Sequence, residues 1–128
     1  MEYTKHTRPS TMKTIYEQTL KVECTASDGK IFIAVANICA IEASGNHAYI
    51  HRSDADKLFV TNSLKELDKR LQSNGFCRVH RQYLLNIAWI HKYHQSEGGC
   101  IEMDDGKKYP ISKSGKMLFW EMIKEVVL

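Results

Sequence analysis

The sequence contains no long hydrophobic run. Its longest apolar stretches, residues 31–36 and 83–90, are far shorter than the ~20 residues that a membrane-spanning helix requires. Residues 1–18 are polar and lack an apolar centre, so they do not resemble a secretory signal. We therefore expect a protein of the cytoplasm that has no membrane partner.

The sequence also lacks paired cysteine motifs. Spacings of 15, 38 and 23 positions separate its four cysteines, and none forms a CxxC pair. In a cytoplasmic protein this pattern favours free, buried thiols. Cys77-x-x-His80 and His91-x-x-His94 have a spacing that metal ligands use, but both pairs fall in expected strands. Because positions i and i+3 of a strand point to opposite faces, we expect no metal site.

Catalytic motifs are missing as well. The sequence has no GxSxG, HExxH, P-loop or GxGxxG motif, and no cysteine stands in a local pattern typical of a nucleophile paired with histidine. We expect no enzymatic activity, no cofactor and no small-molecule substrate.

The composition is that of an ordinary globular domain, with 43% hydrophobic and 26% charged residues in a chain of 128. Residues 1–19 are polar and predict a flexible leader or linker, and residues 20–128 predict one domain.

Positive charge is concentrated, although the net charge is only +3. No acidic residue lies between Asp68 and Glu97, a window that holds five lysines and arginines, and none lies in residues 106–120, which hold four lysines. Two basic windows of this kind are typical of a surface that faces phosphates, although two ordinary solvated faces would have the same pattern.

Short strands at roughly ten-residue spacing dominate the hydrophobic pattern. The alternation of apolar and polar residues, with turn signals at Asp28-Gly29 and Asp104-Asp105-Gly106, predicts strands over residues 20–26, 30–35, 38–43, 47–52, 57–61, 76–79, 88–94, 100–103 and 108–112. Ser63 and Glu66 have capping-box spacing, which predicts a short helix over 64–72, and a closing helix is expected over 117–128. The expected fold class is mainly β, with one short central helix and one C-terminal helix.

The segment Gly75–Asn86 is the most informative. It places Arg81 and Gln82 among the apolar residues Phe76, Val79, Leu84 and Leu85. It is either an edge strand with solvated polar residues or a loop whose apolar residues are buried and hold Arg81 outward. Arginine can donate two hydrogen bonds to guanine, and glutamine can pair with adenine.

Four segments together resemble the LytTR DNA-binding domain, the output domain of many bacterial response regulators. They are Ile41–Ile50, Ser63–Leu67, Gly75–Asn86 and Tyr109–Lys113, and they stand in the family's order and spacing within residues 20–125. The resemblance implies an elongated stack of small antiparallel sheets. It also implies that loops, and no recognition helix, enter the major groove of double-stranded DNA, with direct repeats near promoters as targets.

The resemblance places the candidate DNA contacts at three positions along the chain. They are Asn46 and His47, then Arg81 and Gln82, then Lys113 and Lys116. Arg78 is a further candidate, for contact with a phosphate. The resemblance nevertheless favours a structural role for Arg78 and for a buried, hydrogen-bonded His80.

Three candidates depart from the residue types that are common in the family. Gln82 stands where a small polar residue is common, His47 where an aromatic residue is frequent, and Lys113-Ser114-Gly115 where an arginine-rich run is common. These departures concern the target sequence. We expect Glu42 to fix a loop through backbone N–H groups, and Trp89 and Trp120 to lie in the core.

The function predicted from the sequence is that of a sequence-specific transcriptional regulator, with dimerisation on DNA as a further expectation. The alternative is a module that has kept the fold but binds another protein, for which exposed strand edges are suited.

Overall fold

The computed structural model describes residues 20–128. The leader predicted over residues 1–19 lies outside the described residues. Four short 3₁₀ turns connect the main elements: η1 (Val35–Asn37), η2 (Gln72–Asn74), η3 (Ile87–Trp89) and η4 (Ser96–Gly98). The main elements are β1 (Lys21–Ala26), β2 (Gly29–Ala34), β3 (Ile38–Ser44), β4 (His47–Arg52), β5 (Leu58–Val60), α2 (Leu64–Leu71), β6 (Phe76–His80), β7 (Tyr83–Asn86), β8 (Ile90–His94), β9 (Cys100–Met103), β10 (Lys108–Pro110) and α3 (Lys113–Ile123).

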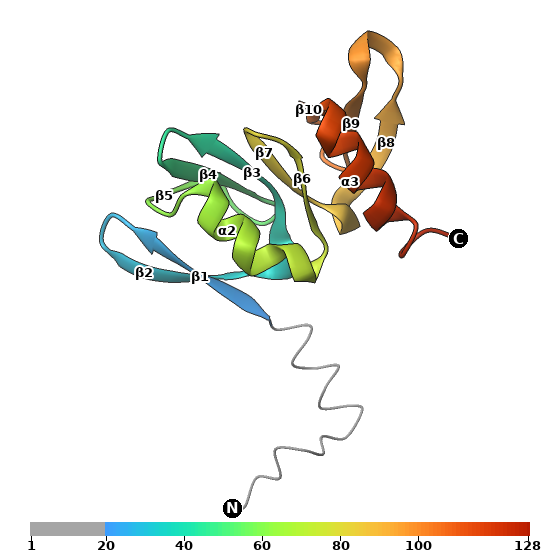
Figure 1. Cartoon of the computed structure of the whole chain (residues 1–128). Coiled ribbons are helices and arrows are strands. Elements are labelled where there is room, and N and C mark those ends of the chain that lie inside the picture. Colours follow the sequence, from blue (N-terminus) through green and yellow to red (C-terminus); the bar gives the residue numbers. More distant parts are fainter. Residues whose placement is uncertain (1–19) are drawn as a thin grey trace, which may run out of the picture.

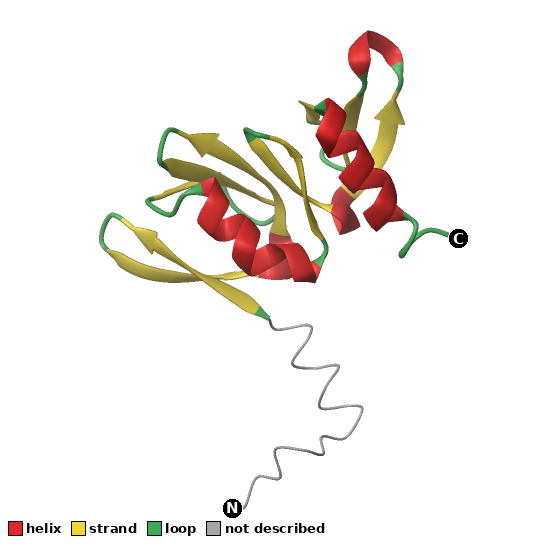
Figure 2. Ribbon diagram, in the orientation of Figure 1, coloured by secondary structure: helices red, strands yellow, loops and turns green. Residues whose placement is uncertain are grey.

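The strands form three antiparallel sheets. Hairpin β1–β2 is one sheet, the second has five strands in the order β5-β4-β3-β7-β6, and the third has the order β10-β9-β8. Figure 1 shows the hairpin at one end of an elongated stack, the five-stranded sheet with α2 in the middle, and the three-stranded sheet with α3 at the other end. Figure 2 shows that strands predominate over helices. The predicted fold class is therefore confirmed. No helix within residues 20–128 has the length and apolarity needed to cross a membrane.

Helix α2 forms because its three leucines fall on one face. Leu64, Leu67 and Leu71 are all buried, and the side chain of Ser63 caps the helix by accepting a hydrogen bond of 3.1 Å from the backbone N–H of Glu66. After η2 the chain turns at Gly75, whose φ of 85° is a conformation that glycine adopts easily.

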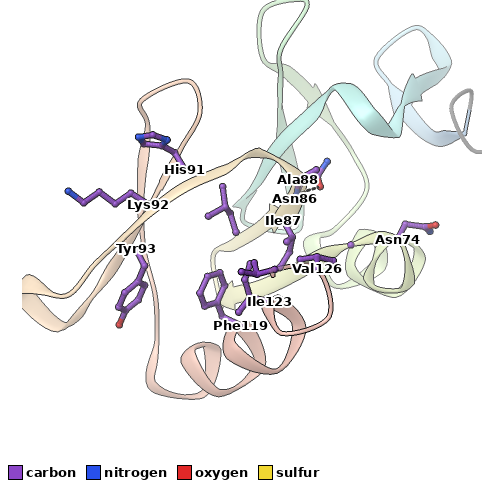
Figure 3. A pocket seen from close by; sticks show the side chains of 13 residues that line it. Asn74, Asn86, Ile87, Ala88, His91, Lys92, Tyr93, Phe119, Ile123 and Val126 are labelled. Atoms are coloured by element: carbon purple, nitrogen blue, oxygen red, sulfur yellow. Dashed lines mark hydrogen bonds between the residues drawn. The ribbon is translucent and has the colours of Figure 1, made fainter.

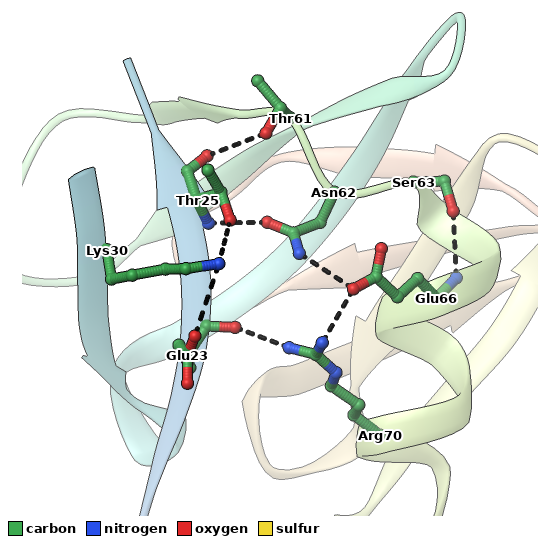
Figure 4. Close-up of polar contacts among 8 residues, drawn as sticks. All are labelled: Glu23, Thr25, Lys30, Thr61, Asn62, Ser63, Glu66 and Arg70. Atoms are coloured by element: carbon green, nitrogen blue, oxygen red, sulfur yellow. Dashed lines mark hydrogen bonds and ion pairs between the residues drawn. The ribbon is translucent and has the colours of Figure 1, made fainter. Parts of the chain in front are cut away.

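A polar network holds hairpin β1–β2 against α2 (Figure 4). Asn62 accepts a 2.8 Å hydrogen bond from the backbone N–H of Thr25 and donates one of 3.0 Å to Glu66. Arg70 donates to the Glu66 carboxylate and to the carbonyl of Glu23, both at 2.7 Å. The carboxylate of Glu66 therefore connects the helix to the hairpin, instead of reaching back to Ser63 as a complete capping box would require.

Two hydrophobic cores lie on the two faces of the five-stranded sheet. Leu84 belongs to the core that α2 and the hairpin cover, and the neighbouring Leu85 belongs to the core that Phe119 of α3 and Ile101 of β9 cover. This division follows from strand geometry, since successive side chains point to opposite faces.

The five-stranded sheet has two different ends. At the end that we call the turn end, two-residue turns join β3 to β4 and β6 to β7. At the other, which we call the closed end, η1, η2 and η3 are bound together by hydrogen bonds of 2.9 Å. These bonds run from the Asn86 side chain to the Ile38 carbonyl, from the Trp89 indole to the Ala36 carbonyl and from the Ile87 backbone N–H to the Gly75 carbonyl.

Two boundaries and one loop expected from the sequence were wrong. The closing helix spans Lys113–Ile123, not 117–128, because Ser112 caps it by accepting a 3.0 Å hydrogen bond from the backbone N–H of Gly115. The segment that carries Leu84 and Leu85 is strand β7, not a loop, and the strand expected from residue 88 begins at Ile90 because η3 precedes it.

Candidate nucleic-acid interface

The β6–β7 turn exposes the side chains of Arg81 and Gln82. The backbone of Gln82 is fixed on both sides, because its N–H donates to His80 Nδ1 at 3.1 Å and its carbonyl accepts from Ala43 N–H on β3 at 2.8 Å. His80 was predicted to be buried and hydrogen-bonded; it is hydrogen-bonded but only half-buried. The turn therefore has a defined backbone and two exposed polar side chains.

The side chain of Arg78 holds this turn by donating hydrogen bonds to two of its backbone carbonyls. Its Nε donates to the carbonyl of His80 at 3.1 Å, and its terminal NH2 group donates to the carbonyl of Arg81 at 2.5 Å. The other terminal nitrogen lies 3.8 Å from a carboxylate oxygen of Asp68 on α2. Burial raises the pKa of Asp68, and the positive charge of Arg78 acts in the opposite direction. In this structure the guanidinium of Arg78 is directed at the protein's own backbone.

The β3–β4 turn carries the next two candidates. Gly45 has a φ of 60°, which permits the tight turn, and Asn46 and His47 are both exposed. His47 Nδ1 lies 3.1 Å from the carbonyl of Thr61, and its ring contacts the edge of Phe59 with centroids 5.4 Å apart. Because a carbonyl can only accept, Nδ1 carries the hydrogen, and in a neutral imidazole Nε2 is left as an acceptor.

The first turn of α3 packs closely on β6. The Ser112 backbone N–H donates to the Val79 carbonyl at 2.9 Å, and a Cβ added at Gly115 would lie 1.9 Å from that same oxygen. Only glycine permits this approach. Lys113 is exposed, whereas Lys116 is half-buried, with its stem beside Gly99.

A surface pocket of about 410 Å³ joins the β6–β7 turn to the beginning of α3. The pocket therefore places Arg81 beside the first turn of α3, which carries Lys113, and Asn46 and His47 lie at the neighbouring turn of the same sheet end. Sequence reasoning missed the serines of this pocket; the signal was Ser112, which stands three residues before Gly115 in capping position. The pocket is lined by Arg78, His80, Arg81, Ser112 and Ser114.

Two further residues do not lie where the sequence predicted. The Glu42 carboxylate bonds His51 Nε2 at 3.1 Å and not a set of backbone N–H groups. Trp120 is 45% exposed rather than part of the core, although Trp89 is half-buried against the second core. Trp120 lies outward because Phe119 takes the inward position of α3.

A larger pocket, of about 570 Å³, lies between β8, η3 and α3. In Figure 3 the side chains of Ile87, Phe119 and Ile123 gather in it, while Lys92 points away. None of the candidate DNA contacts lines this pocket. Its lining combines apolar side chains with those of His91, Lys92 and Tyr93.

The structure also shows the surroundings of the two pairs with metal-ligand spacing, Cys77 with His80 and His91 with His94. Cys77 is buried, and burial raises the pKa of its thiol to about 12. His94 Nε2 bonds a Glu102 carboxylate oxygen at 2.7 Å, and this bond lowers the pKa of Glu102. All four cysteines, which lie within the described part of the chain, are free. Within that part, no three such side chains are grouped as metal ligands.

Comparison with known proteins identifies the family. The family model of the LytTR DNA-binding domain matches residues 28–124. This chain belongs to the LytTR DNA-binding domain family. The match spans α2, both turns at the turn end and α3, so every candidate contact falls within the LytTR domain.

Two known proteins illustrate the relationship. The CO-responsive transcriptional regulator RcoM of Rhodospirillum rubrum is 33% identical over 76 residues, which are 59% of this chain and 32% of RcoM. The matched stretch is thus about a third of that relative. A solved LytTr DNA-binding domain, from a Bacillus cereus protein described as a methyl-accepting/DNA response regulator, shares the fold with a TM-score of 0.68. It is 23% identical, and the alignment covers 80% of this chain and 95% of that one.

Proposed function

We propose that this LytTR domain is a sequence-specific reader of double-stranded DNA within a transcriptional regulator, and that the β3–β4 and β6–β7 turns enter the major groove. The observation that carries the proposal is the exposure of Arg81 and Gln82 on a turn whose backbone is fixed by Arg78, His80 and Ala43. A fixed backbone lowers the conformational cost of aiming a side chain at a base. The names of the two related proteins, a transcriptional regulator and a response regulator, point in the same direction.

Each candidate has a chemical role in this proposal. Arg81 donates two hydrogen bonds to guanine, and Gln82 pairs with adenine. His47 offers Nε2 as an acceptor, because Nδ1 donates to Thr61, and the base groups it suits are the amino groups of adenine and cytosine. Asn46 stands beside it on the same turn.

The lysines of α3 and Arg78 have supporting roles. Lys113 and Lys116 contact phosphates, which add affinity and fix the register without reading sequence. Arg78 holds the β6–β7 turn through two carbonyls, so we assign it a positioning role in preference to the phosphate contact that the sequence left open. We further propose that two copies bind together on direct repeats. The protein acts in the cytoplasm and has neither a cofactor nor enzymatic activity.

Selection of bound duplexes from a random pool tests this proposal. The proposal expects an enriched motif, with a guanine whose enrichment is lost in Arg81→Ala. A pool that shows no enrichment with the wild-type chain would refute sequence-specific binding.

A protein-interaction module is the second candidate function. It is favoured by the outward surface of α3, where Met117 is 73% exposed and Trp120 45% exposed. Binding to a protein partner through this surface would depend weakly on salt, whereas DNA binding depends on it steeply.

A further inference from the structure

His51 is one of three buried polar residues in the described part of the chain, with 8% of its surface exposed. Its ring lies between two charged side chains. Nε2 is 3.1 Å from Glu42 Oε1, and Nδ1 is 3.2 Å from Lys107 Nζ. An ammonium group has only donors, so Nδ1 accepts from Lys107, and Nε2 therefore carries the hydrogen that is donated to Glu42. The three side chains form a directional chain of hydrogen bonds from Lys107 through a neutral His51 to Glu42.

This chain connects two sheets. Glu42 is on β3 and His51 is on β4, adjacent strands of the five-stranded sheet. Lys107 is in the turn between β9 and β10 of the three-stranded sheet. The ring of Tyr109 on β10 packs against His51 with centroids 6.3 Å apart, so the polar chain is bordered by a buried aromatic contact.

The candidate DNA contacts are divided between the same two parts of the molecule. Asn46, His47, Arg81 and Gln82 belong to the turn end of the five-stranded sheet, whereas Lys113 and Lys116 belong to α3, which follows β10. Contact of α3 with β6 fixes it on one side, through Ser112, Gly115 and Val79. The second hydrophobic core also joins the two parts, through apolar contacts that are non-directional. The bond between Lys107 and His51 is a second fixed point, on β4.

We propose that Glu42, His51 and Lys107 are positioning residues that hold the three-stranded sheet and α3 at the orientation in which Lys113 and Lys116 reach the same duplex as Arg81. The inference rests on the proposed function, because it concerns how two sets of DNA contacts are aligned. A chain of hydrogen bonds that all point one way suits this purpose, since each bond polarises the next and the geometry is specific. None of the three residues touches DNA in this proposal.

The test is a double-mutant cycle on affinity for a selected duplex. His51→Leu, which fills the space without polar groups, should weaken binding roughly 5- to 150-fold, the usual range of coupling between two sites. His51→Gln, which can accept from Lys107 and donate to Glu42, should restore most of the affinity. In a Lys113→Ala/Lys116→Ala background, His51→Leu should have little further effect, because α3 no longer contributes its lysines.

Two controls make the outcome decisive. The loss caused by Arg81→Ala should be the same in the wild-type and His51→Leu backgrounds. If His51→Leu does not fold, Lys107→Met breaks the same chain from an exposed turn. It should weaken binding in the wild-type background but leave affinity and salt slope unchanged in the Lys113→Ala/Lys116→Ala background, because Lys107 itself contacts no phosphate.

Equal losses from His51→Leu with and without the α3 lysines, or no loss at all, would overturn the positioning role. A wild-type chain that shows no preferred duplex would refute the proposed function itself and the positioning role with it. Specific wild-type binding that requires Arg81 but is indifferent to His51→Leu and Lys107→Met would refute the positioning role alone.

Discussion

The turn end and the closed end of the five-stranded sheet use polar side chains in opposite ways. At the closed end, the side chains of Asn86 and Trp89 donate hydrogen bonds to backbone carbonyls of β3 and η1. At the turn end, Arg81, Gln82 and Asn46 are exposed, and the polar bonds that fix the turns are made by residues behind them, such as Arg78 and His80.

Both ends belong to the same strands. They differ in whether their polar side chains bond to the protein's own backbone or remain exposed to solvent. A buried carbonyl that loses its donor costs folding free energy, which makes the closed end a stability device. An exposed side chain on a fixed turn costs little to the fold and remains free to bind a partner. The comparison predicts that substitutions at the two ends separate stability from DNA affinity.

The largest effect is expected between the two ends, in the core. Leu85 is completely buried on β7, four positions after Arg81. Leu85→Ala should cost about 2–5 kcal/mol of the free energy of unfolding, because it removes buried methyl groups and leaves a cavity. Urea or thermal unfolding measures this loss. DNA affinity should fall only as far as the folded fraction falls, and a larger fall would mean that the core and the turn are not separable.

Arg81→Ala should have the opposite effect. If Arg81 donates to a guanine, affinity for the preferred duplex should fall by about 1–3 kcal/mol and specificity should relax at one position. The melting temperature should hardly change, because the side chain is exposed. Titration of the preferred duplex and of single-base variants measures both effects. Equal weakening of all duplexes would make Arg81 a phosphate contact instead.

Asn86→Ala at the closed end is the matched control for Arg81→Ala. Asn86 is 5% exposed, donates to the Ile38 carbonyl and accepts from Ala88 N–H, so its loss should cost about 1–3 kcal/mol of stability. The folded variant should bind the preferred duplex like the wild type. A stable Asn86→Ala with reduced specificity would contradict the separation of the two ends.

Arg78→Lys should have a smaller effect than Arg81→Ala. Lysine keeps the charge but cannot donate to the carbonyls of His80 and Arg81 with one planar group, and a hydrogen bond of this kind contributes about 0.5–1.5 kcal/mol. We expect weaker binding of the preferred duplex with an unchanged salt slope. A slope reduced by about 1 in Arg78→Ala would instead identify a phosphate contact.

The smallest effect concerns the thiols, which belong to neither end. Burial raises the pKa of Cys24 to about 11 and that of Cys77 to about 12. Only the thiolate reacts, so at pH 8 both should resist iodoacetamide in the folded protein, whereas half-exposed Cys100 should react first. Mass spectrometry of alkylated peptides measures the order. Chelator and reductant should leave the unfolding midpoint unchanged, and rapid labelling of Cys77 would show that the second core opens.

Local pattern was enough to predict most of the strands and α2. Alternation in residues 20–35 identified hairpin β1–β2, and the leucine spacing with Ser63 identified α2. The loop expected at Leu84 and Leu85 was wrong because a strand buried on both faces shows no alternation of apolar and polar residues.

The sequence pattern could not predict contacts between residues that are far apart along the chain. The bonds from Arg78 to its own turn and from Lys107 to His51 depend on the strand register and on how the sheets pack. The approach of Gly115 to the Val79 carbonyl likewise appears only when α3 lies on β6. The resemblance to a family placed the candidate contacts, and the structure shows that Arg78 and Arg81 line one pocket with Ser112 and Ser114.

The most direct test of the account is the salt dependence of binding to a preferred and a scrambled duplex. If about five phosphates are contacted, log K for the preferred duplex should fall with log salt at a slope of about −4 to −5. The preferred duplex should bind more tightly than the scrambled one at every salt concentration, since base contacts add to the phosphate contacts. A slope near zero, or equal affinity for the two duplexes, would contradict the claim that the turn end reads DNA.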